Sequence, residues 1–195
     1  MIHVPQSRYT REYYLHNCDG YTEDGSLCRR LQTLLSHRGE GGEGLEVADI
    51  GCGRGEAAKY LTENGYHVFS VDYSYAAVPL FEKNCGDGLP FLRHDVSLGM
   101  PWLKDGFFDL VILADIIEHL YPEQLRVLAA DVLRILKKGG SCLIDTPIME
   151  GGESELHVDI KNSAQAVMSF FPGFKLIATH WYKKPEHCNL ILVKS

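Results

Sequence analysis

The sequence predicts an α/β protein in which helices cover a mostly parallel, doubly wound sheet that ends in an antiparallel hairpin. After residue 44, short apolar runs bounded by Gly and Asp alternate with amphipathic stretches of helical length. This alternation is typical of parallel strands whose connecting helices lie on both faces of the sheet. The last two apolar runs are separated by only four residues, 183–186. That connection is too short for a crossover, so the two strands must pair as an antiparallel hairpin.

The individual elements follow from the same pattern. The predicted strands are 45–50, 67–71, 89–93, 108–114 and 141–146, with the hairpin strands 174–182 and 187–194 at the end. Apolar residues at helical spacing predict helices over 55–64, 75–84, 122–136 and 161–171. The sheet is therefore expected to contain seven strands.

Residues 1–44 are expected to form an N-terminal helical lid within the same domain as the main body, 45–195. The lid contains leucines at helical spacing, at Leu27, Leu31, Leu34 and Leu35. The glycine-rich stretch 38–44 favours a turn between the lid and the main body. A length of 195 residues suits one domain.

Composition and charge exclude several classes of protein. Hydrophobic residues make up 45% of the chain and charged residues 23%, which disfavours wholesale disorder. The formal charge is −7 and no Lys/Arg run exceeds a pair, so no nucleic-acid partner is expected. Six cysteines without a CxxC spacing indicate reduced thiols. No secretory leader and no apolar run of about 20 residues is visible, so we expect a cytoplasmic protein without a membrane partner.

A glycine-rich loop follows the first strand of the main body. Gly51, Gly53 and Gly55 stand between that strand and the next helix, where glycines let the backbone approach a ligand closely. Asp49 ends the first strand and Asp72 ends the second. A carboxylate at the tip of the second strand can accept hydrogen bonds from both hydroxyls of a ribose. The pattern indicates a site for a cofactor that contains a nucleoside.

Two classes of cofactor use such a loop. A dinucleotide enzyme has the spacing G-x-G-x-x-G around a pyrophosphate, whereas this chain has glycines at 51, 53 and 55 and Glu56 next. A carboxylate at that point would repel a pyrophosphate. S-adenosylmethionine has no phosphate and carries a sulfonium, so it tolerates acidic neighbours. This favours S-adenosylmethionine over a nicotinamide dinucleotide.

Five segments in order resemble the motifs of class I S-adenosylmethionine-dependent methyltransferases. They are VADIGCGRGEAAKYL, SVDYS, RHDVS, FDLVILADIIEHL and LKKGGSCLIDTP. The resemblance covers residues 45–195 and includes the terminal hairpin, which distinguishes these enzymes from nucleotide-binding dehydrogenases. It implies a Rossmann-like fold and methyl transfer from S-adenosylmethionine to a small-molecule acceptor, with release of S-adenosylhomocysteine.

The resemblance also implies roles for individual residues. Asp49 would hold the cofactor's amino group, Asp72 its ribose, and Asp95 its adenine amino group. Tyr73 would pack on the adenine. In the lid, either Tyr14 or Tyr21 would lie near the sulfonium or the carboxylate. The implied cofactor-binding set is Asp49, Gly51, Cys52, Gly53, Gly55, Asp72, Tyr73, Asp95, Val96, Leu113, Ala114, Asp115, Tyr14 and Tyr21.

The sequence says less about the site that binds the methyl acceptor. A general base is needed only if the acceptor must lose a proton, and the candidates are His119 and His157. Asp115 and Asp145 could converge on a divalent cation, but Thr146 stands where metal-dependent relatives have Asn, so no metal is expected. The acceptor atom (O, N or C) and the oligomeric state stay open. A nicotinamide oxidoreductase and a non-catalytic S-adenosylmethionine-binding protein are the alternatives.

Overall fold

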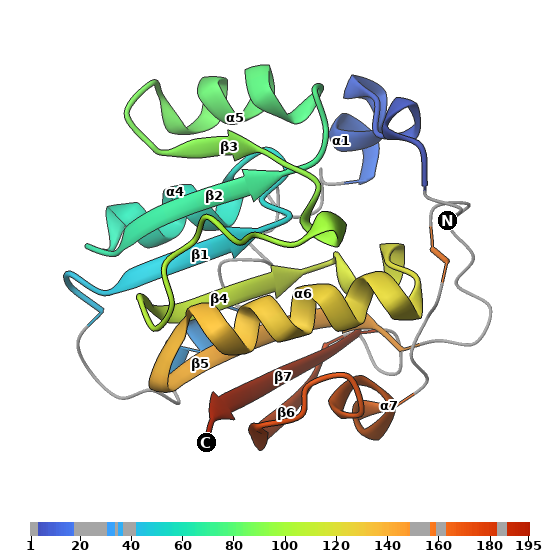
Figure 1. The fold of residues 1–195 in the computed structure, drawn as a ribbon. Helices are drawn as coiled ribbons and strands as arrows, with labels where there is room; N and C mark the ends of the chain where they lie inside the picture. The colour runs from blue at the N-terminus through green and yellow to red at the C-terminus, as the bar shows by residue number, and fades with distance from the viewer. Residues whose placement is uncertain are drawn as a thin grey trace. The chain divides into compact units, whose positions relative to one another are not determined.

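The computed structural model describes residues 4–17, 31–33, 35–36, 42–148, 157–158, 163–182 and 187–195. The chain forms two compact units, one made of Pro5–His94 and the other mainly of Asp95–Ser195. Each unit is an α/β structure with its own strands and helices (Figure 1).

The Pro5–His94 unit contains three parallel strands in the order β3-β2-β1. They are β1 (Glu46–Ile50), β2 (His67–Asp72) and β3 (Phe91–Arg93). The helices are η1 (Gln6–Arg8), α1 (Arg11–Asn17), α4 (Glu56–Glu63) and α5 (Ala77–Cys85). Ile50 pairs with Val71, and Asp72 pairs with Arg93. The carboxyl ends of these strands therefore lie at one edge, where the glycine loop begins.

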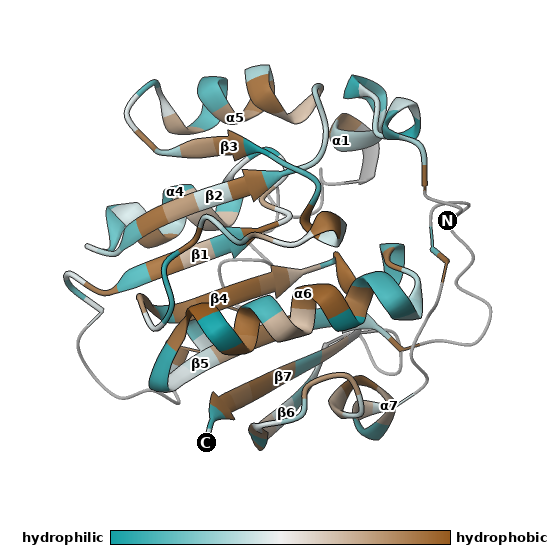
Figure 2. Ribbon diagram, viewed as in Figure 1, coloured by the Kyte–Doolittle hydropathy of each residue, from teal (hydrophilic) through white to brown (hydrophobic). Residues whose placement is uncertain are grey.

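The core of this unit forms because apolar residues recur at the spacing of each element. In β1, Val47, Ala48 and Ile50 are fully buried. Helix α4 buries Ala57, Ala58 and Leu61, which lie on one face, and leaves its polar residues outward (Figure 2).

The Asp95–Ser195 unit contains four strands in the order β4-β5-β7-β6. They are β4 (Phe108–Ala114), β5 (Leu136–Pro147), β6 (Phe174–Tyr182) and β7 (His187–Lys194). The helices are η2 (Val96–Leu98), η3 (Ile117–His119), α6 (Pro122–Ile135) and α7 (Ala164–Met168). Strand β4 runs parallel to β5, whereas β7 is antiparallel to both β5 and β6. Strands β4 and β7 are hydrophobic along most of their length, as expected of strands covered on both faces (Figure 2).

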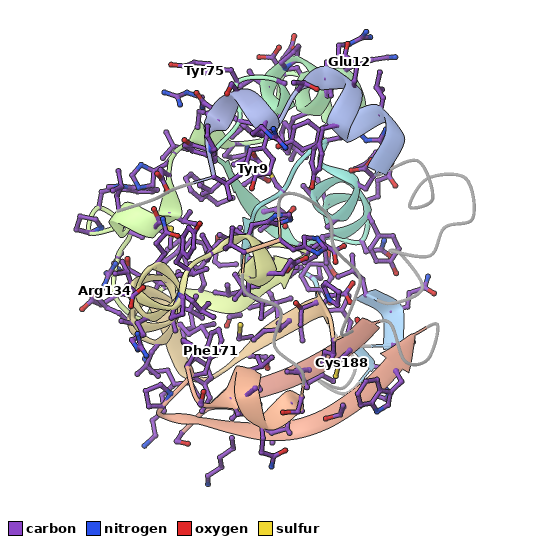
Figure 3. All side chains as sticks on the ribbon, turned by 90° about the vertical axis from the view of Figure 1, so that its right-hand side faces the viewer. Tyr9, Glu12, Tyr75, Arg134, Phe171 and Cys188 are labelled. Carbon is purple, nitrogen blue, oxygen red and sulfur yellow. The ribbon has the colours of Figure 1, made fainter. Side chains whose placement is uncertain are left out.

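Helix α6 covers β5 with a continuous apolar stripe and is tied at its end by Arg134. The stripe consists of Leu125, Leu128, Ala129, Val132 and Ile135. The Arg134 guanidinium, labelled in Figure 3, donates to the carbonyls of Leu103 and Met100 at 2.6 and 2.8 Å. It also forms ion pairs with Asp105 and Asp131. These bonds hold the 100–105 segment against the helix.

The predicted fold class is confirmed, because seven strands form a mostly parallel sheet whose C-terminal strands pair antiparallel. Strand β4 and both hairpin strands have the predicted bounds. The prediction for β5 was wrong at its start, which is Leu136 and not residue 141. Leu136 pairs with Phe108 and the register then shifts, so the glycines at 139 and 140 form an irregularity within the strand.

Most other bounds differ by one or two residues, and several predictions fall outside the described residues. Helix α7 spans only Ala164–Met168, and β3 begins at Phe91. Residues 27, 34, 38–41 and 183–186 lie outside the described part of the chain. The assignment of residues 1–44 as a lid stays a prediction. Among the residues that the structure describes, no helix is long and apolar enough to cross a membrane.

Candidate cofactor and acceptor sites

The glycine loop after β1 is a tight turn with left-handed backbone. The amides of Gly51 and Cys52 donate to the carbonyl of Val71 at 2.8 and 3.1 Å, and that of Gly55 donates to the Cys52 carbonyl at 2.9 Å. Gly51, Gly53 and Gly55 have φ angles of +80°, +52° and +84°. Other residues adopt this region only with strain, so the shape of the loop requires the three glycines that the sequence singles out.

Gly55 is also closely packed, which leads to a prediction. A Cβ added there would lie 2.5 Å from Cys85 Sγ and 2.6 Å from Phe81 Cδ2, in addition to the strain of φ +84°. We expect Gly55→Ala to lower the free energy of unfolding by about 2 kcal/mol, as measured by urea denaturation.

Gly106→Ala is the control for Gly55→Ala. Gly106 also has a positive φ, +58°, but nothing lies within 4 Å of an added Cβ. This variant should therefore show the backbone strain alone, about 1 kcal/mol. Equal losses in the two variants would contradict close packing at Gly55.

Asp72 ends β2 as the centre of a hydrogen-bond cluster. Its Oδ2 accepts from the Gly53 amide at 2.8 Å. Its Oδ1 accepts from the Ser74 amide at 2.8 Å and from the Tyr14 hydroxyl at 3.1 Å. A carboxylate has about four acceptor positions, so these three donors leave room for a further hydroxyl. The structure thus joins Asp72 directly to the glycine loop and to α1.

The residues that precede and form α1 are tied to the tip of β2. The Ser74 hydroxyl donates to the Tyr9 carbonyl at 2.8 Å, and the side-chain amide of Gln6 donates to the Tyr73 carbonyl. Tyr9, labelled in Figure 3, also meets the Tyr73 ring edge-on at 6.2 Å. The Tyr14 ring is buried, with Cε1 only 3.4 Å from where a Cβ on Gly53 would lie. Of the two lid tyrosines, Tyr14 therefore lies at the glycine loop, while Tyr21 is outside the described residues.

Two buried carboxylates give this unit an unusual electrostatic character. Asp49 is only 2% exposed, and its Oδ2 has no hydrogen-bond partner among the described residues. Burial raises the pKa of Asp49 to about 7, with Asp72 and Glu56 adding to the effect. Burial also raises the pKa of Asp72, although the donors at Ser74 and Gly53 counter it. A cationic ligand is favoured at such a site, because it compensates buried negative charge.

Glu56 forms an ion pair beside the glycine loop. Its Oε1 lies 2.6 Å from the Arg54 guanidinium. Its negative charge still contributes to the raised pKa of Asp49. Repulsion of a pyrophosphate by Glu56 therefore stays a prediction.

The other predicted cofactor residues lie in the Asp95–Ser195 unit. Asp95 caps η2 by accepting from the Ser97 amide at 3.0 Å, and Val96 and Leu113 are buried. Asp115, after Ala114 at the end of β4, has φ +50° and is the only non-glycine with positive φ in the described part of the chain. Its amide donates to the Asp145 carbonyl at 2.9 Å. The functional roles of these residues stay predictions.

The structure brings the two histidines proposed for catalysis together. The His119 and His157 rings meet edge-on with centroids 5.1 Å apart. The amide of Val158 donates to the Glu118 carbonyl at 2.9 Å, which fixes the backbone beside η3. Glu118 is buried, and its Oε2 accepts from the Thr146 hydroxyl at 3.2 Å. The sequence showed Glu118 next to His119, but it carried no signal that either would meet His157.

The fold and the loop define a class of protein: an α/β protein with an antiparallel last strand in the sheet, a glycine loop after β1 and an acidic residue at the tip of β2. Residues 48–144 match the family described as a methyltransferase domain. The chain is 27% identical over 128 residues to a probable S-adenosylmethionine-dependent methyltransferase of Mycolicibacterium smegmatis, which covers 66% of this chain and 48% of that protein. The family match and this relative support its assignment to the class I S-adenosylmethionine-dependent methyltransferases.

One further sequence similarity supports the family, and one solved structure supports the fold. The chain is 31% identical over 121 residues to a ubiquinone biosynthesis O-methyltransferase of Maricaulis maris, covering 58% of this chain and 46% of that protein. A solved structure of Burkholderia thailandensis 1,6-didemethyltoxoflavin-N1-methyltransferase, with its namesake compound and S-adenosylhomocysteine bound, has a TM-score of 0.75 at 18% identity. That similarity covers 97% of this chain and 87% of that one. The match spans less than half the length of both curated relatives.

Proposed function

We propose that this protein binds S-adenosylmethionine and transfers its methyl group to a small-molecule acceptor, releasing S-adenosylhomocysteine. The observation that carries the proposal is the Asp72 carboxylate, held 2.8 Å from the Gly53 amide at the tip of β2. This carboxylate has room to accept a ribose hydroxyl while the glycine loop lies beside it.

The buried charge near the loop supports a sulfonium cofactor over a dinucleotide. S-adenosylmethionine carries an ammonium and a sulfonium against one carboxylate, so it is a net cation. Asp49, with a buried carboxylate oxygen that has no described partner, suits the ammonium. The aromatic ring of Tyr14 can face a sulfonium, because a cation is attracted to the face of a ring. A pyrophosphate would instead add negative charge beside Asp49 and Asp72.

The remaining cofactor contacts are proposed from the family resemblance. Asp95 would accept from the adenine amino group, and Tyr73 would pack on the ring. The methionine end would lie near Leu113, Ala114 and Asp115. Cys52 and Val96 complete the proposed cofactor-binding set.

Methyl transfer itself is an in-line displacement. A lone pair of the acceptor forms the new bond to the methyl carbon while the bond to sulfur breaks and its electron pair stays on sulfur. The protein mainly has to align the acceptor and exclude water. If the acceptor must lose a proton, His119 or His157 would accept it.

A small acceptor is supported by the charge of the chain and by the names of two similar proteins. A net charge of −7 disfavours a polyanionic acceptor. One relative is named as an O-methyltransferase of ubiquinone biosynthesis, and one structural neighbour holds a small heterocycle.

Isothermal titration of S-adenosylhomocysteine into the protein tests the proposed function. We expect saturable binding at one site per chain, and no change in the fluorescence of NADH on mixing with the protein. A single-turnover assay with S-adenosylmethionine and a panel of small phenols, amines and carbon acids then reports methyl transfer. Absence of binding by both forms of the cofactor, together with binding of NADH, would identify a dinucleotide enzyme. Cofactor binding without transfer to any of the acceptors would favour a non-catalytic binding protein.

A further inference from the structure

Glu118, His119 and His157 form a compact cluster of metal-ligand types in the Asp95–Ser195 unit. One ligand atom from each residue, a carboxylate oxygen or an imidazole nitrogen, lies within 4.8 Å of the other two. Among the described residues this is the one group of three such side chains that meets that criterion. We call these three residues the Glu118 cluster.

The backbone holds the Glu118 cluster together from two distant parts of the chain. Glu118 and His119 belong to the single turn of η3 that follows β4. His157 is held there because the amide of the next residue, Val158, donates to the Glu118 carbonyl at 2.9 Å. The two imidazole rings meet at 69° with their centroids 5.1 Å apart. Convergence of the three side chains therefore follows from a specific backbone hydrogen bond.

The Glu118 carboxylate has the surroundings of an oriented ligand. Its residue is only 1% exposed, and a buried charge is costly unless a cation or hydrogen bonds compensate it. One carboxylate oxygen, Oε2, accepts from the Thr146 hydroxyl at 3.2 Å. Metal-binding carboxylates are commonly oriented by such a neighbouring hydrogen bond. His119 and His157 are both half-buried, so a cation can reach them from solvent.

We propose that the Glu118 cluster binds one divalent first-row transition-metal cation. Two imidazoles and one carboxylate form a ligand set that suits Zn²⁺, Co²⁺ or Fe²⁺ far better than Mg²⁺ or Ca²⁺, which prefer oxygen. Ligand atoms at about 2.1 Å from one ion can be at most about 4.2 Å apart, so a small rotation of a ring completes the site. Three protein ligands leave at least one coordination position for water or for an oxygen or nitrogen atom of a small molecule.

This cation site differs from the one that the sequence analysis weighed and set aside. That site consisted of Asp115 and Asp145, both carboxylates, and the reason for expecting no metal was Thr146. In the structure the Thr146 hydroxyl donates to Glu118. Thr146 therefore orients a ligand of the proposed site, although its presence disfavours a site at Asp115 and Asp145.

Titration of Co²⁺ into the chelator-treated full chain tests the proposal. The visible absorption of Co²⁺ reports its coordination, and Zn²⁺ should displace it while Mg²⁺ should not. We expect one ion per chain, and we expect His119→Ala and His157→Ala each to weaken binding at least about 100-fold. Thr146→Val should weaken it about 10-fold, as an orienting neighbour does. Circular dichroism of each variant shows whether it is folded.

His67→Ala is the matched control. The His67 Nδ1 lies 3.1 Å from Glu46 Oε1. Among the described residues, this histidine–carboxylate pair belongs to no group of three metal-ligand side chains. Its removal should leave the Co²⁺ affinity unchanged. Absence of binding by wild type, or unchanged affinity in both His119→Ala and His157→Ala, would overturn the proposal. The readout does not depend on methyl transfer, and titration of S-adenosylhomocysteine into the same samples keeps a failure of the metal site distinct from a failure of the proposed function.

Discussion

Asp72→Ala is expected to weaken binding of S-adenosylhomocysteine by about 3 kcal/mol, roughly a hundredfold in the dissociation constant. The substitution removes the proposed acceptor for a ribose hydroxyl, and a hydrogen bond to a charged group contributes about 1.5–3 kcal/mol. It also removes the acceptor of the Gly53 amide, whose bond of 2.8 Å holds the glycine loop. Isothermal titration of wild type and variant measures the effect.

Two other variants separate ligand contacts from loop structure. Tyr14→Phe removes only the 3.1 Å bond to Asp72 Oδ1 and frees that position for the ligand, so its affinity should stay within a few-fold of wild type. Asp87→Ala removes an exposed carboxylate from the same unit and should bind as wild type does. Unchanged affinity in Asp72→Ala, in a variant whose unfolding transition is intact, would remove the main support for the cofactor site.

We expect Asp49→Asn to remove a loss of folding stability that the wild type undergoes as pH rises. Burial raises the pKa of the Asp49 carboxyl to about 7 from its ordinary 3.8. Between these pH values the folded protein binds more protons at Asp49 than the unfolded chain does. Folding stability contributed by this residue therefore falls as pH rises from about 4 to about 7. The full swing corresponds to roughly 4 kcal/mol at 1.36 kcal/mol per pKa unit.

The measurement is the difference in the free energy of unfolding between Asp49→Asn and wild type, determined by urea denaturation from pH 4 to pH 8. The variant should gain on wild type steadily across this range, whatever constant energy the buried amide costs. Asp87→Asn, at an exposed position of the same unit, is the control variant. A flat difference for Asp49→Asn would mean that its carboxyl is ionised throughout. The same variant should bind S-adenosylmethionine more weakly, since it lacks the anion for the cofactor's ammonium.

The sequence alone predicted the bounds of those elements that are marked by neighbouring residues in the chain. Strand β4 and the strands β6 and β7 have the predicted bounds, because each is an apolar run with a clear break at both ends. The glycines of the loop and the acid at the tip of β2 were also identified, since strand, turn and helix follow one another within a few residues. The start of β5 was missed because Gly139 and Gly140 resemble a turn, whereas pairing with β4 carries the strand through them.

Only the tertiary structure decided which side chains meet. The Tyr14 hydroxyl reaches Asp72 across 58 positions of sequence, and that bond distinguishes Tyr14 from Tyr9 and Tyr13. His157 lies against His119, where the backbone bond from Val158 to Glu118 fixes one segment beside the other. Glu56 is paired with Arg54, which its place in the motif did not reveal. Helical and strand periodicity reflect the local geometry of the chain, but burial, pKa and ligand clusters depend on contacts between distant segments, which that periodicity does not specify.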